Sequence, residues 1–342
     1  MTTWTDFLSG EGATLDDDIV SFGDATADTA TLAAGTVAVP LLHLGLVQST
    51  GPDSAPFLHN LFSNDVNKLP AGSAQWNSFN SPKGRMLASF LLWHEDEGHS
   101  LLMSADILPA MHKKLSMYIL RSKVRLADVS AGRALIGLAG PTVAATLEAA
   151  GLPFPTTDMH EALVAGVRTI RLGAEAAIVV VDTEAAPDAY RKLRSAGAVP
   201  AGTNAWQLAM VRAGLPLVTS ATQEEFVAQM LNYDLIGGIS FQKGCYPGQE
   251  IVARTKYLGK LKKRMYRVAV AAQPAPATGD DLYSAAFGEQ SAGKLVNVAA
   301  LGGGAFEALA VMQNSCVEEG DVHLGSPDGP LLSVLELPYS LS

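Results

Sequence analysis

Residues 243–254 read KGCYPGQEIVAR and place Cys245, one of only two cysteines in the chain, on a bend rich in glycine and proline. Glycine lets the backbone turn tightly and proline stiffens it, and functional side chains tend to lie on such constrained loops. Lys243 supplies a positive charge nearby, which favours the thiolate form of a partly exposed cysteine. We therefore expect Cys245 to be a functional thiol rather than a small buried packing residue. For Cys316, in the strand-like stretch VMQNSCVEEG, we expect the buried packing role.

The basic residues are unevenly distributed along an acidic chain. The 342 residues carry a net charge of −10, which argues against indiscriminate binding to nucleic acid because phosphate contacts need clustered lysine and arginine. Seven of the 24 basic residues nevertheless lie within residues 254–267. This cluster predicts a local cationic surface; the alternative is a solvated strand edge that discourages aggregation.

The chain shows no signal typical of a membrane or secreted protein. No apolar run approaches the roughly 18 residues that a membrane-spanning helix needs. The first residues, MTTWTDFLSGEGATLDDD, are acidic where a signal peptide would be basic. Two cysteines far apart in the sequence do not resemble the disulfide framework of a secreted domain. We expect a cytoplasmic protein that does not contact membranes.

Hydrophobic periodicity predicts an α+β protein of three parts. An N-terminal α+β lobe covers residues 1–130, a second α+β lobe that carries the KGCYPGQE loop covers 131–260, and a C-terminal antiparallel β-barrel covers 261–342. The order strand, helix, strand, strand, helix in the second lobe matches the ferredoxin-like, split βαβ plan. Thr222 and Glu225 have capping-box spacing, so we expect a short amphipathic helix before the cysteine bend.

The stretch WHEDEGH, residues 93–99, contains histidine and acidic residues of the types that bind divalent metals. Neighbouring positions on a tight turn point in different directions, so we expect an exposed acidic hairpin tip instead. No H-E-x-x-H or C-x-x-C spacing occurs, and no G-x-S-x-G elbow is present. Neither a dedicated metal site nor a hydrolase triad is therefore expected.

The longer stretch ISFQKGCYPGQEIVARTKYLGKLKKR, residues 239–264, resembles the K-G-C-[YF]-x-G-Q-E signature of the YgfZ family of folate-binding proteins, relatives of the glycine-cleavage T-protein. The resemblance continues, in family order, through GPDSAPFLHNLFSNDV, SPKGRMLASF, RSKVRLADV, NAWQLAMVRAGLP and LPYSLS. It implies a cloverleaf of two α+β lobes and a C-terminal barrel around a central cavity that holds tetrahydrofolate. It also implies a role in the assembly or repair of iron–sulfur clusters in client enzymes, including one that modifies tRNA.

The resemblance implies a site built around the cysteine bend. Cys245 and Lys243 match the positions expected to carry chemistry. Independently of the resemblance, the basic residues of 254–267 offer a further hypothesis, a non-catalytic module whose basic face docks tRNA weakly or a client enzyme. A pterin needs an aromatic face and polar partners for its ring N–H groups, and the anionic glutamate tail of folate needs a cation. The residues expected to contact folate are Trp206, Gly244, Tyr246, Gly248, Gln249, Glu250 and Arg254. A core role is the alternative for Trp206.

Two departures from the family pattern bear on the activity. The aminomethyltransferase branch carries a pair of aspartates where NSPKGRMLAS has Leu87 and Ala88. One-carbon transfer needs a group that orients or deprotonates the folate amine, so a folate-dependent transferase is the alternative rather than the expected function. Leu44 stands where some members place another aromatic residue. The pterin contacts are therefore expected to differ in detail.

Overall fold

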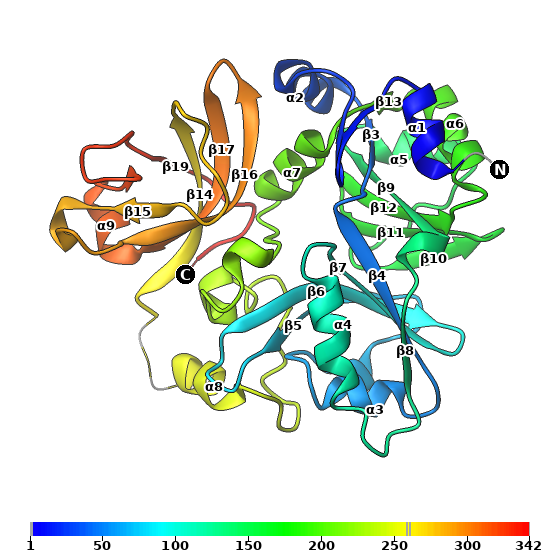
Figure 1. The fold of residues 1–342 in the computed structure, drawn as a ribbon, viewed down its shortest axis with the longest axis horizontal. Coiled ribbons are helices and arrows are strands. Elements are labelled where there is room, and N and C mark those ends of the chain that lie inside the picture. Colours follow the sequence, from blue (N-terminus) through cyan, green and yellow to red (C-terminus); the bar gives the residue numbers. More distant parts are fainter. Residues whose placement is uncertain (1–2, 258, 260, 342) are drawn as a thin grey trace. The chain divides into compact units, whose positions relative to one another are not determined.

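The computed structural model describes residues 3–257, 259 and 261–341, and chain contacts divide it into two compact units (Figure 1). The first unit comprises the chain up to Ser54, residues 69–75 and residues 91–209. The second comprises residues 55–68, 76–90 and the chain from Met210 onward. The division into three consecutive parts, residues 1–130, 131–260 and 261–342, stays a prediction.

The first unit is built on a six-stranded sheet with the order β10-β11-β12-β9-β3-β13, in which β13 pairs with β3 in parallel and the remaining neighbours are antiparallel. Its helices and strands are α1 (Trp4–Gly10), β1 (Thr14–Asp16), β2 (Ile19–Ser21), α2 (Ala25–Ala34), β3 (Val37–Pro40), β4 (Leu44–Thr50), β7 (Gly98–Ser104), α4 (Leu108–Ser116), β8 (Arg125–Asp128), β9 (Arg133–Ala139), α5 (Val143–Ala149), β10 (Glu161–Val164), β11 (Val167–Gly173), β12 (Ala176–Asp182), α6 (Ala186–Ser195) and β13 (Val199–Pro200).

The helix α6 shows how local sequence and packing agree in this unit. Pro187 lies in its first turn, and Gly197, with a φ of +98°, follows its end, as the sequence predicts. Its buried face carries Tyr190, which packs edge-on against Trp4 and Phe7 of α1 and donates a hydrogen bond to the sheet. Aromatic packing between these two helices therefore closes one face of the sheet.

Four elements carry the chain between the units: α3 (Ser54–His59), β5 (Ala74–Asn80), β6 (Met86–Glu95) and α7 (Thr203–Arg212). A five-stranded sheet has the order β5-β6-β7-β4-β8, and β6 and β7 form the hairpin that the sequence predicts at residues 93–99.

The tip of that hairpin is not simply an exposed acidic turn. Glu95 accepts hydrogen bonds from Trp93 Nε1 and Ser100 Oγ and forms an ion pair with buried Arg168 at 2.8 Å. His99 is buried and its Nδ1 lies 2.9 Å from the Ser54 hydroxyl. The expectation was wrong for these two side chains because partners far away in the sequence, which periodicity does not reveal, remove them from solvent.

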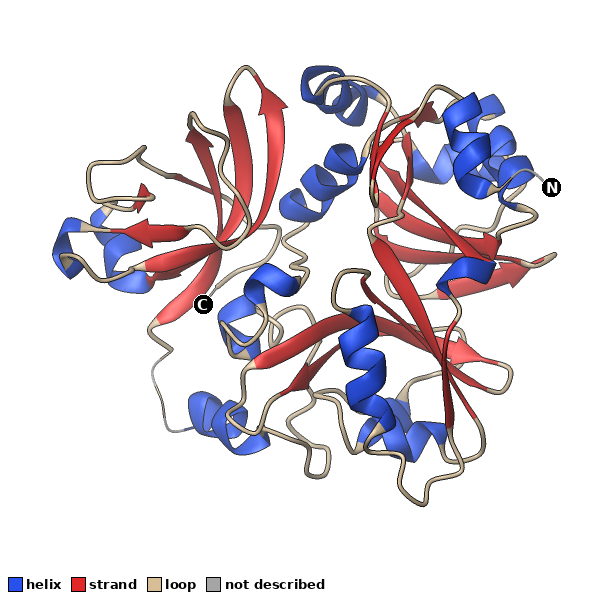
Figure 2. Ribbon diagram, in the orientation of Figure 1, coloured by secondary structure: helices blue, strands red, loops and turns tan. Residues whose placement is uncertain are grey.

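The second unit ends in a curled six-stranded sheet with the order β18-β15-β16-β17-β14-β19, in which all recorded pairs are antiparallel (Figure 2). The antiparallel strands agree with the β-structure that the sequence predicts for the C-terminal residues. The remaining elements of the unit are α8 (Gln249–Tyr257), β14 (Lys263–Ala271), β15 (Asp281–Tyr283), β16 (Gly293–Gly302), β17 (Ala305–Gln313), α9 (Asn314–Glu319), β18 (His323–Leu324) and β19 (Ser333–Leu335), with 3₁₀ helices at Val66–Lys68, Ser220–Thr222, Ala228–Leu231 and Ala285–Phe287.

The amphipathic helix expected around Thr222 and Glu225 is absent from this part of the chain, all of which the structure describes. Two 3₁₀ turns stand in its place, and the capping box joins Thr219 and Thr222. The intervening backbone pairs with the start of β6: Glu224 N donates to Met86 O, and Met86 N donates to the next part of the segment. These hydrogen bonds to β6 satisfy backbone N–H and C=O groups that would pair with one another in a helix. Tertiary contacts therefore override the helical periodicity of the local sequence.

No helix in the described ranges is long and apolar enough to cross a membrane.

Two buried histidines make the stability of the protein sensitive to acid. Burial lowers the pKa of His43 and of His99 from 6.5 to about 4. The unfolded chain therefore takes up protons between pH 6.5 and pH 4 that the folded chain does not, and stability falls as pH drops through this window, by up to about 3 kcal/mol for each residue. Urea unfolding at a series of pH values should show this loss. A double variant, His43→Gln with His99→Gln, should flatten the slope; an unchanged slope would assign the loss to carboxylates instead.

Candidate functional site

Cys245 lies in the turn that precedes α8 and is exposed, whereas Cys316 in α9 is fully buried. The signature stretch therefore divides into a turn, which ends at Gly248, and a helix, which begins at Gln249. The sequence indicated the turn but not the helix.

Two glycines bring the cysteine turn against the loop between β5 and β6. A Cβ atom added to Gly248 would lie 2.6 Å from both Gly84 Cα and Ser81 O, and a Cβ atom added to Gly84 would lie 2.8 Å from Ile251 Cβ. Both glycines also have positive φ angles, +78° and +73°, which other residues rarely adopt. The glycines of PKGR and PGQE are therefore required by one contact between two backbones.

Lys243 anchors the turn from its other side. Its Nζ donates hydrogen bonds to the carbonyl oxygens of His59 and Phe62, at and just beyond the C-terminus of α3. Carbonyl groups at a helix C-terminus favour a cation. The ammonium group also lies 4.9 Å from the centre of the Tyr246 ring, and burial lowers the pKa of Lys243 to about 8. The structure thus gives this lysine an anchoring position; its predicted part in thiol chemistry stays a prediction.

The neighbours of Lys243 differ in what they expose. Tyr246 is buried, and burial raises the pKa of its hydroxyl. A Cβ atom added to Gly244 would meet nothing within 4 Å. Gln249 is half-buried and donates a long hydrogen bond (3.5 Å) to Lys243 O, while Glu250 lies exposed on the first turn of α8. The signature therefore presents Cys245, Gly244 and Glu250 to solvent and uses its other side chains to hold the turn.

Buried polar atoms without a partner lie beside the glycine contact. Asn80, at the end of β5, is 1% exposed, and neither its Nδ2 nor its Oδ1 has a hydrogen-bond partner. The hydroxyl of the next residue, Ser81, is likewise buried and unpartnered. Such unpartnered atoms cost free energy in the folded protein. Sequence analysis missed both residues, although they begin the NSPKGR stretch, residues 80–85, that contains Gly84.

Trp206 lies in α7 within the first unit, whereas the cysteine turn belongs to the second. Its side chain is 4% exposed and packs flat against Gly137 of β9, where a Cβ atom would lie 2.4 Å from Cε3 of the indole. This is the environment of a core tryptophan. The folate contact expected of Trp206 stays a prediction.

The basic run is not one continuous cationic surface. Arg264 forms an ion pair with Asp234, and Arg267 shares buried Glu307 with Arg212, so both guanidinium groups are engaged inside the second unit. Arg254, Lys256 and Lys262 are exposed, and Lys256 Nζ lies 3.6 Å from the centre of the Phe241 ring. Lys260 lies outside the described residues. The expected surface over residues 254–267 is therefore wrong for Arg264 and Arg267, because their ion pairs stabilise the fold.

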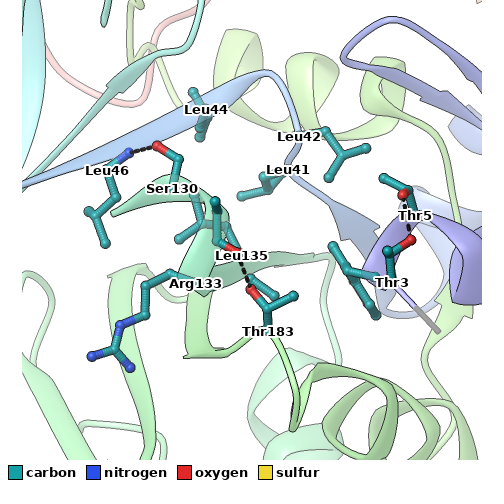
Figure 3. A pocket seen from close by; sticks show the side chains of 13 residues that line it. Thr3, Thr5, Leu41, Leu42, Leu44, Leu46, Ser130, Arg133, Leu135 and Thr183 are labelled. Carbon is teal, nitrogen blue, oxygen red and sulfur yellow. Dashed lines mark hydrogen bonds between the residues drawn. The ribbon is translucent and has the colours of Figure 1, made fainter. Parts of the chain in front are cut away.

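A separate hollow of about 280 Å³ lies in the first unit (Figure 3). Five of its thirteen lining residues are leucines, including Leu44. Its hydroxyl groups already have partners: Thr183 donates to Ala131 O, and Ser130 accepts from Leu46 N. None of the folate-contact or thiol residues expected from the sequence, all of them described, lies among its lining. Its one charged side chain, Arg133, already forms an ion pair with Asp182.

The chain is similar in sequence to a known protein family. A family model described as the GCVT N-terminal domain matches residues 28–236. The chain is 30% identical over 301 residues to the tRNA-modifying protein YgfZ of Yersinia enterocolitica, with 87% of this chain and 90% of that protein covered. It is 30% identical over 321 residues to the protein of the same name from Photorhabdus laumondii, with 91% and 95% covered.

A solved structure is similar in fold. The glycine cleavage system aminomethyltransferase T from Bartonella henselae superposes with a TM-score of 0.79 over 99% of this chain and 97% of that chain, at 17% sequence identity. At this identity the similarity concerns the fold alone.

The glycine contact gives a direct test of how the turn is held. Gly248→Ala should lower the free energy of unfolding by about 2 kcal/mol or more, because the added methyl group meets backbone atoms and the φ angle is strained. Gly244→Ala, whose methyl group enters open space, should change stability by less than about 0.5 kcal/mol. Urea unfolding measures both, and equal stabilities of the two variants would contradict the contact.

Proposed function

Because the chain belongs to the YgfZ family and carries a GCVT N-terminal domain, we propose that it is a folate-binding accessory protein of tRNA modification that supports iron–sulfur client enzymes, with Cys245 as its functional thiol. The observation that carries this proposal is an exposed cysteine on a turn held by a backbone contact and a buried lysine. We place this activity in the cytoplasm, where unpaired cysteines stay reduced.

The thiol is suited to a transient or shared role. A single cysteine cannot hold a stable iron–sulfur cluster, which takes about four ligands. Among the described residues, no group of three or more histidine, cysteine, aspartate or glutamate side chains is placed to bind a metal. Cys245 would therefore act either as a ligand completed by a client enzyme or small thiols, or as a redox group. Its exposure makes the sulfur accessible to either partner.

The polar residues beside the turn fit a reduced folate. A pterin edge offers both N–H donors and acceptor atoms, and the Asn80 amide can satisfy one of each. The Ser81 hydroxyl adds a further donor and acceptor. We propose that these two residues hold the ring edge, and that Arg254 takes the anionic tail. When bound, folate would supply one-carbon chemistry or serve only as a structural ligand.

The other expected folate contacts remain part of this proposal. Gly244 and Gly248 let the backbone approach a ligand, and Gln249 with Glu250 offers hydrogen-bonding groups at the start of α8. Tyr246 and Trp206 are both buried, and the folate contact predicted for each stays a prediction. The central cavity expected from the family belongs to the same proposal.

A weak tRNA contact is proposed for the exposed remainder of the basic run. Arg254, Lys256 and Lys262 supply the positive charge, and Tyr257, which is 65% exposed, supplies a surface on which a base can stack. Arg264 and Arg267 are left out of this surface because their ion pairs already use them.

The transferase alternative finds less support. Leu87 and Ala88, which stand where the aminomethyltransferase branch carries aspartates, are both buried apolar residues of β6. Neither side chain can orient or deprotonate a folate amine. In our proposal, this chain therefore uses the aminomethyltransferase-like fold to bind folate and not to transfer a one-carbon group.

Replacing Asn80 separates ligand binding from stability. Asn80→Leu should raise the free energy of unfolding by about 1 kcal/mol, because it removes an unpartnered buried amide, yet weaken tetrahydrofolate binding about tenfold. Asn297→Leu is the matched control: its amide both donates to and accepts from Leu217, so its loss should be destabilising. Urea unfolding and fluorescence titration with tetrahydrofolate measure both effects. Unchanged folate affinity in Asn80→Leu would remove this residue from the site.

Replacing the thiol tests its functional role. Cells that carry Cys245→Ala in place of the wild-type protein should lose most tRNA thiomethylation, whereas the purified variant should keep its stability because the side chain is exposed. Cys316→Ala, which removes the buried thiol, should leave the modification in place. Full thiomethylation in the Cys245→Ala cells would exclude the thiol from the mechanism.

A further inference from the structure

A second cationic segment, residues 112–125, comprises the end of α4, the connection to β8 and the first residue of β8, and the proposed site does not use it. Its sequence, HKKLSMYILRSKVR, contains five lysine or arginine residues and no acidic residue, in a chain whose net charge is −10. We name this segment the basic–apolar loop; Figure 1 shows it as a long connection beyond the end of α4.

Large apolar side chains of the basic–apolar loop are exposed. Leu120 is 88% exposed, Met117 64% and Tyr118 40%. Leu120 also has a φ of +44°, a conformation that costs a branched side chain free energy. A strained and solvent-exposed leucine contributes nothing to the core, so its position indicates a use outside the folded chain.

The loop is held in a defined shape. A Cβ atom added to Gly51 would lie 2.3 Å from Lys123 O, so the two backbones touch. The Asp53 carboxylate accepts a hydrogen bond of 2.7 Å from Lys123 N, and Ser122 N donates one of 2.7 Å to Ile119 O. Because these contacts order the backbone beforehand, a partner would lose less free energy in ordering the loop on binding.

An open depression of about 730 Å³ adjoins the exposed leucine. Its lining residues are Asp53, Tyr118, Leu120, Arg121 and Ser122. Tyr118 and Leu120 give the depression an apolar wall, and Arg121 lines it beside Asp53, whose carboxylate already accepts the hydrogen bond from Lys123 N. Exposed Lys123 and Arg125 lie in the same segment, so the positive charge of the basic–apolar loop suits an apolar side chain that has acidic neighbours. Nucleic-acid bases would stack on Tyr118 but gain little from Met117 and Leu120.

We propose that the basic–apolar loop docks an acidic segment of a partner protein, with an apolar side chain of the partner packed on Leu120 and Met117 and its carboxylates paired with Arg121, Lys123 and Arg125. This inference rests on the proposed function, because an accessory protein must contact the enzyme that it supports. It adds a docking site in the first unit to the chemical site in the second.

The test uses a synthetic peptide in which leucines follow a helical spacing and the other positions are mostly glutamate. Leu120→Gly removes the apolar side chain and also relieves the positive φ, so it should not destabilise the fold. We expect it to weaken peptide binding about tenfold, and Arg121→Glu to do the same. Matched controls are Leu163→Ser, an exposed leucine of β10, and Lys192→Glu, an exposed cation of α6; each should change the affinity less than about twofold.

Salt and other probes complete the test. Binding of the acidic peptide should weaken as salt rises, because charge pairs at an exposed rim are screened. Equal peptide affinity in wild type, Leu120→Gly and Arg121→Glu would overturn the proposal. So would loop-dependent binding of phosphatidylcholine–phosphatidylglycerol vesicles or of a single-stranded RNA in the absence of peptide binding. Tetrahydrofolate titration of Leu120→Gly should match wild type; a wild-type protein that binds the peptide but no folate would refute the proposed function and leave the docking site standing.

Discussion

The candidate site depends on one close contact between two stretches of backbone. Gly84 and Gly248 face each other at a distance that leaves no room for a Cβ atom on either, and both have φ angles that favour glycine. This contact joins the β5–β6 loop to the cysteine turn, and it brings the unpartnered Asn80 and Ser81 next to the segment that carries Cys245. Without it, the turn would have no fixed position relative to those polar atoms.

Lys243 and Asn80 show opposite ways in which a site treats buried polar groups. The lysine ammonium has two carbonyl partners and an aromatic ring, so its burial is compensated and it holds the turn in place. The asparagine amide has no partner, so its burial lowers stability, and in our proposal folate supplies the missing hydrogen bonds. Proteins often depart from full satisfaction of polar groups at functional positions, and here the departure lies beside an exposed thiol.

Local patterns predicted what local interactions determine. Proline and glycine mark the ends of α6, residues 261–342 were predicted to form antiparallel strands, and the glycine-rich bend predicted the exposed cysteine. Predictions were wrong where a distant partner decides the outcome. Glu95 is drawn into an ion pair with Arg168, seventy-three residues away in the chain. The segment after Thr222 pairs with β6 instead of forming a helix.

By itself, the sequence determined the family signature, the α+β class and the cysteine most suited to chemistry, because these follow from residue types at short spacing. Only the tertiary structure decided which charged and polar side chains are available. Arg254, Arg264 and Arg267 belong to the same basic run and look alike in the sequence. The guanidinium groups of Arg264 and Arg267, however, form ion pairs with Asp234 and Glu307. Asn80 gave no signal until the fold buried it without a partner. Whether a charged or polar side chain can bind another molecule depends on its contacts with residues far away in the sequence. Short-range sequence patterns carry no information about these contacts.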